Sequence, residues 1–187
     1  MSTTTARHHD AATVDALFNP KVVAVIGASP DTLFSRMLLD GMREHGFQGR
    51  IYVVNPSRGS VLGYQSFKSV AALPEKADIA VILLGAKNVF ASLEEVAATG
   101  CKAAYVLAAG FEKPEQMAAL RAHVDKLGIV LIGPNCNGFI NAGAGLHLWT
   151  GPINRPYRQG SVALLGQSSG VLGALCCAVW DLSLIHI

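Results

Sequence analysis

Residues 22–30 are Val22-Val23-Ala24-Val25-Ile26-Gly27-Ala28-Ser29-Pro30, an apolar run followed by a group of small residues. The unbroken apolar run predicts a strand that is buried on both faces of a parallel sheet. Gly27, Ala28 and Ser29 then predict a tight turn ahead of a helix. Small residues in such a turn let the backbone approach a pyrophosphate, which the N–H groups and the positive dipole of the helix N-terminus stabilise. A tight turn that holds no ligand is the alternative.

The rest of the chain repeats this alternation of short apolar runs and longer amphipathic segments. The apolar runs predict further buried strands at Ile51–Val54, Ile79–Leu84, Ala103–Leu107, Ile129–Ile132 and Val162–Leu165. The amphipathic segments predict helices at Leu33–His45, Val89–Thr99 and Glu115–Leu127. Strands that alternate with helices favour right-handed crossovers. We therefore expect an α/β fold, with a Rossmann-like, doubly wound parallel sheet over residues 16–142.

The two ends of the chain depart from this pattern. The polar N-terminus lacks the apolar stretch of a signal peptide, and we expect residues 1–15 to form a disordered lead-in. Residues 143–160 are rich in glycine and proline and show no period, which predicts a linker. Residues 161–187 predict one strand, one turn and one helix, as at the start of a second domain. One such unit is too small to bury a core, so we expect this second domain to be truncated.

Composition excludes several classes of protein. The net charge is +2, and no Lys/Arg run or basic-aromatic pattern is present, so we expect no nucleic-acid partner. No apolar run reaches about 18 residues, so we expect no membrane-spanning helix. The four cysteines lack the spacing of a metal site, and we expect no bound metal. Reduced thiols are typical of a cytoplasmic protein.

The end of the second predicted strand narrows the choice of nucleotide. An NAD site usually has a carboxylate there, which accepts hydrogen bonds from the ribose. This chain instead has Asn55-Pro56-Ser57-Arg58. Ser57 and Arg58 suit a phosphate on the ribose, either the 3′-phosphate of coenzyme A (CoA) or the 2′-phosphate of NADP. A solvated loop charge is the alternative for Arg58.

Three blocks of sequence carry a resemblance to a known family. They are Val23–Pro30, Ile132-Gly133-Pro134-Asn135-Cys136-Asn137-Gly138 with Ile140-Asn141 after it, and Gly160–Gly170. In order and spacing the chain resembles the CoA-binding region of NDP-forming acyl-CoA synthetases, the superfamily that includes the succinyl-CoA synthetase alpha subunit. The resemblance implies that residues 161–187 begin a flavodoxin-like second domain.

The resemblance also implies a role for particular residues. The CoA diphosphate would lie against Gly27, Ala28, Ser29 and Pro30. The adenosine and its 3′-phosphate would lie against Asn55, Pro56, Ser57 and Arg58. An apolar wall for the adenine or pantetheine would come from Leu83, Leu84, Gly85 and Ala86.

The remaining implied positions lie along the path to the thiol. The arm of CoA would be lined by Ala108, Ala109 and Gly110. The reactive end would be near Asn135 and Cys136, where Cys136 is expected to be a packing residue rather than a nucleophile. A phosphoryl group would be steadied at a helix N-terminus by Ser168, Ser169 and Gly170. The family glycine of the first helix is replaced near Ser35.

The implied activity belongs to a longer enzyme. Members of the superfamily convert a carboxylic acid, CoA and ATP or GTP with Mg to acyl-CoA, nucleoside diphosphate and phosphate. They form an acyl phosphate and a phosphohistidine, and they need an ATP-grasp domain or subunit. The resemblance places that histidine beyond residue 187, so we expect no catalytic residue in this chain and no activity from it alone. His147 is expected at the surface of the linker.

Two other functions stay open from the sequence. An NADP-dependent oxidoreductase is compatible with the first turn and Arg58, although no hydride-transfer domain is recognisable. A non-catalytic CoA-binding regulatory module is compatible with the same residues. The predicted strand and helix after Gly160 favour the ligase.

Overall fold

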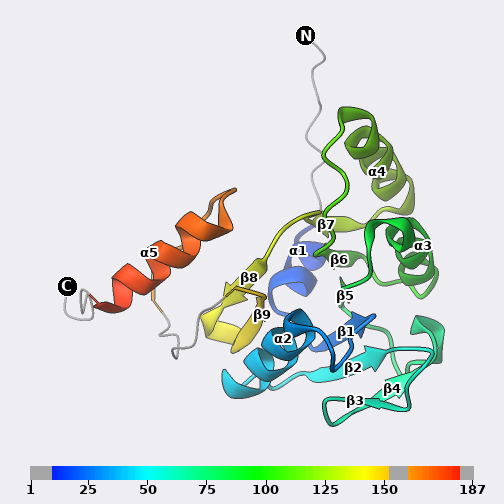
Figure 1. The fold of residues 1–187 in the computed structure, drawn as a ribbon, viewed down its shortest axis with the longest axis horizontal. Helices are drawn as coiled ribbons and strands as arrows, with labels where there is room; N and C mark the ends of the chain where they lie inside the picture. The colour runs from blue at the N-terminus through cyan, green and yellow to red at the C-terminus, as the bar shows by residue number, and fades with distance from the viewer. Residues whose placement is uncertain (1–9, 152–159, 182–187) are drawn as a thin grey trace.

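The computed structural model describes residues 10–151 and 160–181. Its centre is a seven-stranded sheet with the strand order β3-β4-β2-β1-β5-β6-β7 (Figure 1). Every pairing in this sheet is parallel except that of β3 with β4. The sheet confirms the predicted Rossmann-like α/β class.

The sheet strands agree closely with the predicted apolar runs. They are β1 (Val22–Ile26), β2 (Arg50–Val54), β3 (Ser60–Val61), β4 (Tyr64–Phe67), β5 (Ile79–Ile82), β6 (Ala103–Val106) and β7 (Val130–Ile132). The helices are α1 (Ala11–Phe18), α2 (Leu33–Glu44), α3 (Val89–Ala98), α4 (Pro114–Leu127) and α5 (Ser169–Asp181). A separate hairpin joins β8 (Gly138–Asn141) to β9 (Leu146–Trp149). The sequence analysis missed α1, β3, β4, β8 and β9.

Strand β1 is buried along its whole length because it has a parallel partner on each side and a layer on each face. Ala24 and Ile26 belong to the core that α3 and α4 cover. Val23 and Val25 belong to the core that α1, α2 and β9 cover. Figure 1 shows these two layers on opposite sides of the sheet. An apolar residue is therefore needed at every position of the strand, as its sequence predicts.

The linker predicted for residues 143–160 begins too early. Strand β9 pairs antiparallel with β8 and packs against α2, and Leu146, Leu148 and Trp149 are buried. Four residues of hairpin strand are too short to stand out from a glycine-rich stretch. Residues 152–159 of the predicted linker lie outside the described residues.

The surface position predicted for His147 is also wrong. Its side chain is buried with 3% exposed, and its ring stacks on His45 at 4.7 Å between centroids. Gly41 allows this close packing, because a Cβ there would lie 2.2 Å from His147 Cδ2. Burial, with the nearby His45, lowers the pKa of His147 from 6.5 to about 4, so the imidazole is neutral at neutral pH.

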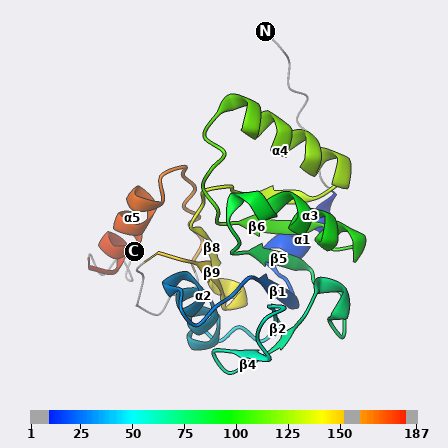
Figure 2. The same cartoon turned by 45° about the vertical axis from the view of Figure 1, so that its right-hand side comes forward.

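Both ends of the chain correct the expected organisation. Residues 11–15 are not disordered: they lie in α1, which is capped by the Asp10 carboxylate accepting from the Thr13 N–H at 2.6 Å. Residues 1–9 lie outside the described residues. Val162–Leu165 do not form the predicted strand: no strand of the described residues pairs with them, and Val162 and Leu165 are strongly exposed. The predicted helix after them is α5, which lies apart from the sheet in both views (Figures 1 and 2).

Candidate functional site

The candidate site lies at the carboxyl ends of the parallel strands. Five loops meet this edge, after β1, β2, β5, β6 and β7. From β1 the chain passes to β2 on one side, and later returns to β5 on the other side. The place between the loops after β1 and β5 is therefore a topological switch point, where open α/β sheets bind their ligands.

Gly27 ends β1 at this switch point with a left-handed φ of 80°. Its N–H donates to the Val54 carbonyl at 2.9 Å, which ties the turn to β2. A Cβ at Gly27 would lie 2.4 Å from Leu84 Cδ2. The side chain of Leu84 therefore leaves no room for a Cβ at Gly27. The contact joins the loops after β1 and β5.

A hydroxyl takes the place of the missing glycine in the first helix. Ser35 is fully buried, and its Oγ accepts the Ser29 N–H at 2.9 Å and lies 2.7 Å from Thr32 Oγ1. Thr32 is the N-cap of α2 but makes no side-chain hydrogen bond to the helix N-terminus. The turn is held by serine and threonine while the positive end of α2 points toward the loops.

The loop after β2 is tied to the first turn by two side chains. Asn55 Nδ2 donates to the Ala28 carbonyl at 2.9 Å, and Asn55 Oδ1 accepts the Ser57 N–H at 2.9 Å. Arg58 Nη2 donates to Asp31 Oδ2 at 2.7 Å. The structure therefore brings the predicted diphosphate turn and the predicted ribose-phosphate loop together. Asp31 was not foreseen.

The other three loops continue the same row. The loop after β5 meets the loop after β6, because a Cβ on Gly110, which has a φ of 103°, would lie 2.9 Å from Ala86 Cβ. The loop after β6 meets the loop after β7 through the Asn135 N–H, which donates to the Ala108 carbonyl at 2.9 Å. The remaining predicted residues of the edge are distributed over all five loops: Pro30 after β1, Pro56 after β2, Leu83 and Gly85 after β5, Ala109 after β6 and Cys136 after β7.

Two further residues at this edge were missed by the sequence analysis. Glu112 Oε1 accepts the Gly110 N–H at 2.8 Å, and this bond holds the pKa of the carboxyl below its usual range. Tyr105 donates its hydroxyl to the Cys136 carbonyl at 3.0 Å, and burial raises the pKa of the phenol. Tyr105 thereby fixes the loop after β7 from inside the core. Cys136 is half-buried beside the same core, in agreement with a packing role.

Ser168, Ser169 and Gly170 are not brought to this edge. They lie at the start of α5, where Ser168 Oγ accepts the Val171 N–H at 3.4 Å. In the part of the chain that the structure describes, no hydrogen bond or ion pair joins them to the five loops. Figure 2 shows α5 beyond the β8–β9 hairpin.

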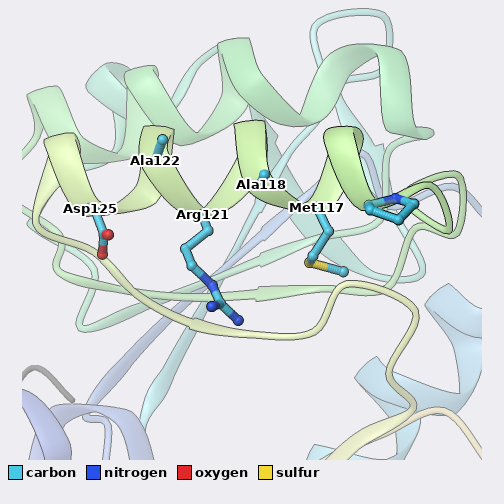
Figure 3. Close-up of a pocket in the computed structure, with 6 residues that line it drawn as sticks. Met117, Ala118, Arg121, Ala122 and Asp125 are labelled. Carbon is cyan, nitrogen blue, oxygen red and sulfur yellow. The ribbon is translucent and has the colours of Figure 1, made fainter. Parts of the chain in front are cut away.

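A depression of about 470 Å³ lies elsewhere, along the outer face of α4 (Figure 3). It is lined by Pro114, Met117, Ala118, Arg121, Ala122 and Asp125. All of these residues are exposed, and none was a predicted site residue. The row of loops is therefore the better candidate, since it joins backbone donors, a cation and a helix N-terminus.

Two classes of site are not found among the described residues. No group of three His, Cys, Asp or Glu side chains could hold a metal ion. Within the same residues, no helix is both long and apolar enough to cross a membrane.

The loops lie within the part of the chain that matches a known family. The profile of the family described as "CoA binding domain" matches residues 21–142. The chain is 34% identical over 176 residues to acetate–CoA ligase [ADP-forming] I of Archaeoglobus fulgidus, covering 91% of this chain and 24% of that protein. It is 36% identical over 172 residues to the alpha subunit of the corresponding Pyrococcus furiosus enzyme, covering 86% of this chain and 36% of the subunit.

A solved structure has a similar fold. The dinucleotide forming acetyl-coenzyme A synthetase 1 of Ca. Korarchaeum cryptofilum, in complex with phosphate and ADP, superposes with a TM-score of 0.81 at 30% identity. The match covers 89% of this chain and 36% of that one. The chain thus spans a quarter to a third of the length of these relatives. With a family match over most of the chain, and with the sheet and loops described above, this protein belongs to the CoA binding domain family.

Proposed function

We propose that this chain is the CoA-binding part of an NDP-forming acid–thiol ligase. The observation that carries the proposal is the row of loops from Arg58 to Asn135 at the carboxyl edge of the sheet. An extended ligand with a nucleotide at one end and a long arm suits such a row. The family match over residues 21–142 supports CoA as that ligand.

The described residues fit each part of CoA by their chemistry. The backbone of Gly27–Pro30 at the N-terminus of α2 would hold the diphosphate. Ser57 and Arg58, at the outer end of the row, would hold the 3′-phosphate, because a guanidinium forms charge-assisted hydrogen bonds with phosphate oxygens. The half-buried Leu83 and Leu84 would border the apolar part of the ligand.

The arm of CoA would run over the middle and far end of the row. Ala108, Ala109 and Gly110 offer no bulky side chain there, and Asn135 and Cys136 would lie near the thiol. This chain's contribution is then to bind CoA and to orient its thiol toward an activated acid. A nucleophile that is already held in the right orientation loses less entropy on reaching the transition state, which lowers the activation barrier.

The chemical steps would require parts of the enzyme other than these loops. We propose the overall reaction of a carboxylate, CoA and ATP or GTP to acyl-CoA, ADP or GDP, and phosphate. An ATP-grasp domain or subunit with Mg would activate the acid as acyl phosphate. A phosphohistidine would carry the phosphoryl group to the nucleoside diphosphate. Residues 161–187 would begin the second domain, with Ser168, Ser169 and Gly170 heading α5.

The alternative function, an NADP-dependent oxidoreductase, would need a pair of catalytic side chains close together. Tyr64 and Lys68 do stand at the Tyr-x-x-x-Lys spacing of one oxidoreductase class. That spacing brings the two side chains together on a helix, whereas Tyr64 lies in strand β4. Four residues of strand span about 13 Å, which separates the pair. This geometry favours the ligase over the NADP enzyme.

The test is calorimetric titration of the chain with CoA, dephospho-CoA, NADP and NAD. We expect CoA to bind most tightly, with dephospho-CoA weaker by about 10- to 100-fold because it lacks the phosphate that Arg58 would bind. Tighter binding of NADP than of CoA would overturn the proposal. In an assay with CoA, ATP or GTP, Mg and carboxylic acids, we expect no acyl-CoA from these 187 residues alone.

A further inference from the structure

Asp31 accepts hydrogen bonds from Arg58, which the proposed function assigns to the 3′-phosphate, and from Ser29, which lies in the turn that it assigns to the diphosphate. Its Oδ2 accepts the Arg58 guanidinium at 2.7 Å and the Ser29 hydroxyl at 3.0 Å. The Asp31 N–H donates in turn to Ser29 Oγ at 3.2 Å, so the carboxylate is fixed against the first turn. One carboxylate oxygen therefore lies where two anion-binding side chains converge.

A phosphate could exchange with this carboxylate. The Asp31 and Arg58 side chains are 72% and 45% exposed, so a ligand can reach both from solvent. Carboxylate and phosphate oxygens are alike as acceptors for a guanidinium. A phosphate beside Arg58 would also meet the negative charge of Asp31, and the two anions repel. Arg36 donates Nε and Nη2 to the Pro30 carbonyl, so these two donors are not directed at Asp31.

We propose, on the basis of the function proposed above, that Asp31 competes with the CoA 3′-phosphate for Arg58 and so weakens the hold of this chain on CoA. The substrate CoA and the product acyl-CoA carry the same nucleotide, so the competition weakens the binding of both equally. An interaction that stabilises bound substrate, transition state and product equally does not lower the chemical barrier. When such an interaction is too strong, it slows the release of the product. Asp31 is in this sense a residue that sets nucleotide affinity and the residence time of the product.

The test compares Asp31→Asn and Asp31→Ala with the parent chain in titrations with CoA and dephospho-CoA. Because an exposed ion pair contributes little, we expect the preference for CoA over dephospho-CoA to rise by about two- to five-fold. The dissociation rate of CoA should fall by a similar factor. In an Arg58→Ala background the Asp31 substitutions should change this preference less than in the parent, because the competition for Arg58 is gone and only the repulsion between Asp31 and the phosphate is left.

Asp40→Asn is the matched control. Asp40 pairs with Arg43 on α2 at 2.7 Å, the same distance and the same pair of residue types, but within one helix. The substitution makes the same change in net charge, and we expect the preference for CoA to stay as in the parent.

Each result has one reading. If the parent chain binds CoA with a preference over dephospho-CoA, but the Asp31 variants leave this preference unchanged or lower it, Asp31 does not compete and instead positions Arg58. An equal gain for both ligands, or the same gain in Asp40→Asn, would reduce the effect to net charge and overturn the inference. If the parent chain itself does not bind CoA, the proposed function fails and the inference fails with it.

Discussion

The two ends of the sheet use similar side chains for different purposes. Each end has an arginine–carboxylate pair, Arg58 with Asp31 at the carboxyl end and Arg50 with Glu75 at the amino end. The pair at the carboxyl end joins two loops that face solvent. The pair at the amino end is extended by Tyr52, whose hydroxyl donates to Glu75 Oε1 at 2.8 Å.

The amino end also bonds its carboxylates to the backbone of the strands. Asp78 Oδ2 accepts the N–H groups of Lys21 at 2.8 Å and Val22 at 3.0 Å, where β1 begins beside β5. The carboxyl end has no such clamp among its described carboxylates, since Asp31 and Glu112 bond within and between loops. We infer that polar groups at the amino end stabilise the sheet, and those at the carboxyl end hold loops ready for a ligand.

The strongest challenge to this division is Gly27→Ala, because Gly27 belongs to both the sheet and the site. An alanine there adopts a left-handed conformation and presses on Leu84, which should cost about 3–5 kcal/mol in the free energy of unfolding. CoA binding should be lost as the first turn shifts. Denaturant unfolding and titration measure the two effects.

A double variant separates the two costs at Gly27. Leu84→Ala removes the side chain that the new Cβ would meet, so Gly27→Ala should cost about 1–3 kcal/mol less in that background. Gly59→Ala is the control for stability, because a Cβ there meets nothing within 4 Å. If the loss of stability in the double variant equals the sum of the losses in the two single variants, Leu84 is not the group that excludes a side chain at Gly27.

Asp78→Ala tests the amino end alone. It removes charge-assisted hydrogen bonds to two backbone N–H groups and should lower the free energy of unfolding by about 2–3 kcal/mol. CoA affinity should not change, since the loops at the other end keep their contacts. Asp40→Ala, at an exposed helix pair, should cost much less. A large loss of CoA affinity in folded Asp78→Ala would break the division between the two ends.

Arg58→Ala tests the carboxyl end alone. CoA affinity should fall by about 1.5–3 kcal/mol, the range for a hydrogen bond to a charged group. The free energy of unfolding should change by less than about 1 kcal/mol, because the pair with Asp31 is exposed. Arg43→Ala, which breaks the comparable pair with Asp40, should leave CoA affinity unchanged. An unaltered CoA affinity in Arg58→Ala would remove Arg58 from the site.

The smallest expected effect is that of Glu75→Gln on acid stability. Hydrogen bonds from Arg50 and then Tyr52 lower the pKa of Glu75 below its ordinary value of 4.5. A carboxyl whose pKa is lower in the folded state stabilises the fold above 4.5, and this contribution is lost as the pH falls through the folded pKa. Thermal melts should therefore show a shallower loss of stability in acid for Glu75→Gln than for the parent. If both proteins lose stability equally as the pH falls, the Arg50–Glu75 pair adds nothing to stability.

Burial explains which parts of this molecule could be predicted from sequence. Strands such as β1 and β5 are covered on both faces, so their unbroken apolar runs are visible without any structure. Because parallel strands all end at the same edge of a sheet, the sequence also predicted that the loops after them lie together. Hairpin β8–β9 is short, and its strands mix apolar residues with glycine and polar residues without a regular period, so only its packing against α2 distinguishes it from a linker.

The contacts between loops could not be predicted in the same way. Asp31 lies 27 residues from Arg58, and nothing local in either segment indicates that they meet. The role of Leu84 in excluding a side chain at Gly27 likewise depends on the pairing of β1 with β5. In contrast, the Asp10 cap of α1 carries a local signal, a carboxylate at a helix start, that could have corrected the expected lead-in.

The order of the strands has a consequence for how the sheet can be assembled during synthesis. Strand β2 adds to one side of β1, and β4 adds to β2. Strand β5 then adds to the other side of β1, followed outward by β6 and β7. Each newly made parallel strand can therefore join an edge that is already exposed, and none has to be inserted between two paired strands. Until β5 emerges, one edge of the apolar β1 has no partner, and that interval is when the growing chain is most exposed to aggregation.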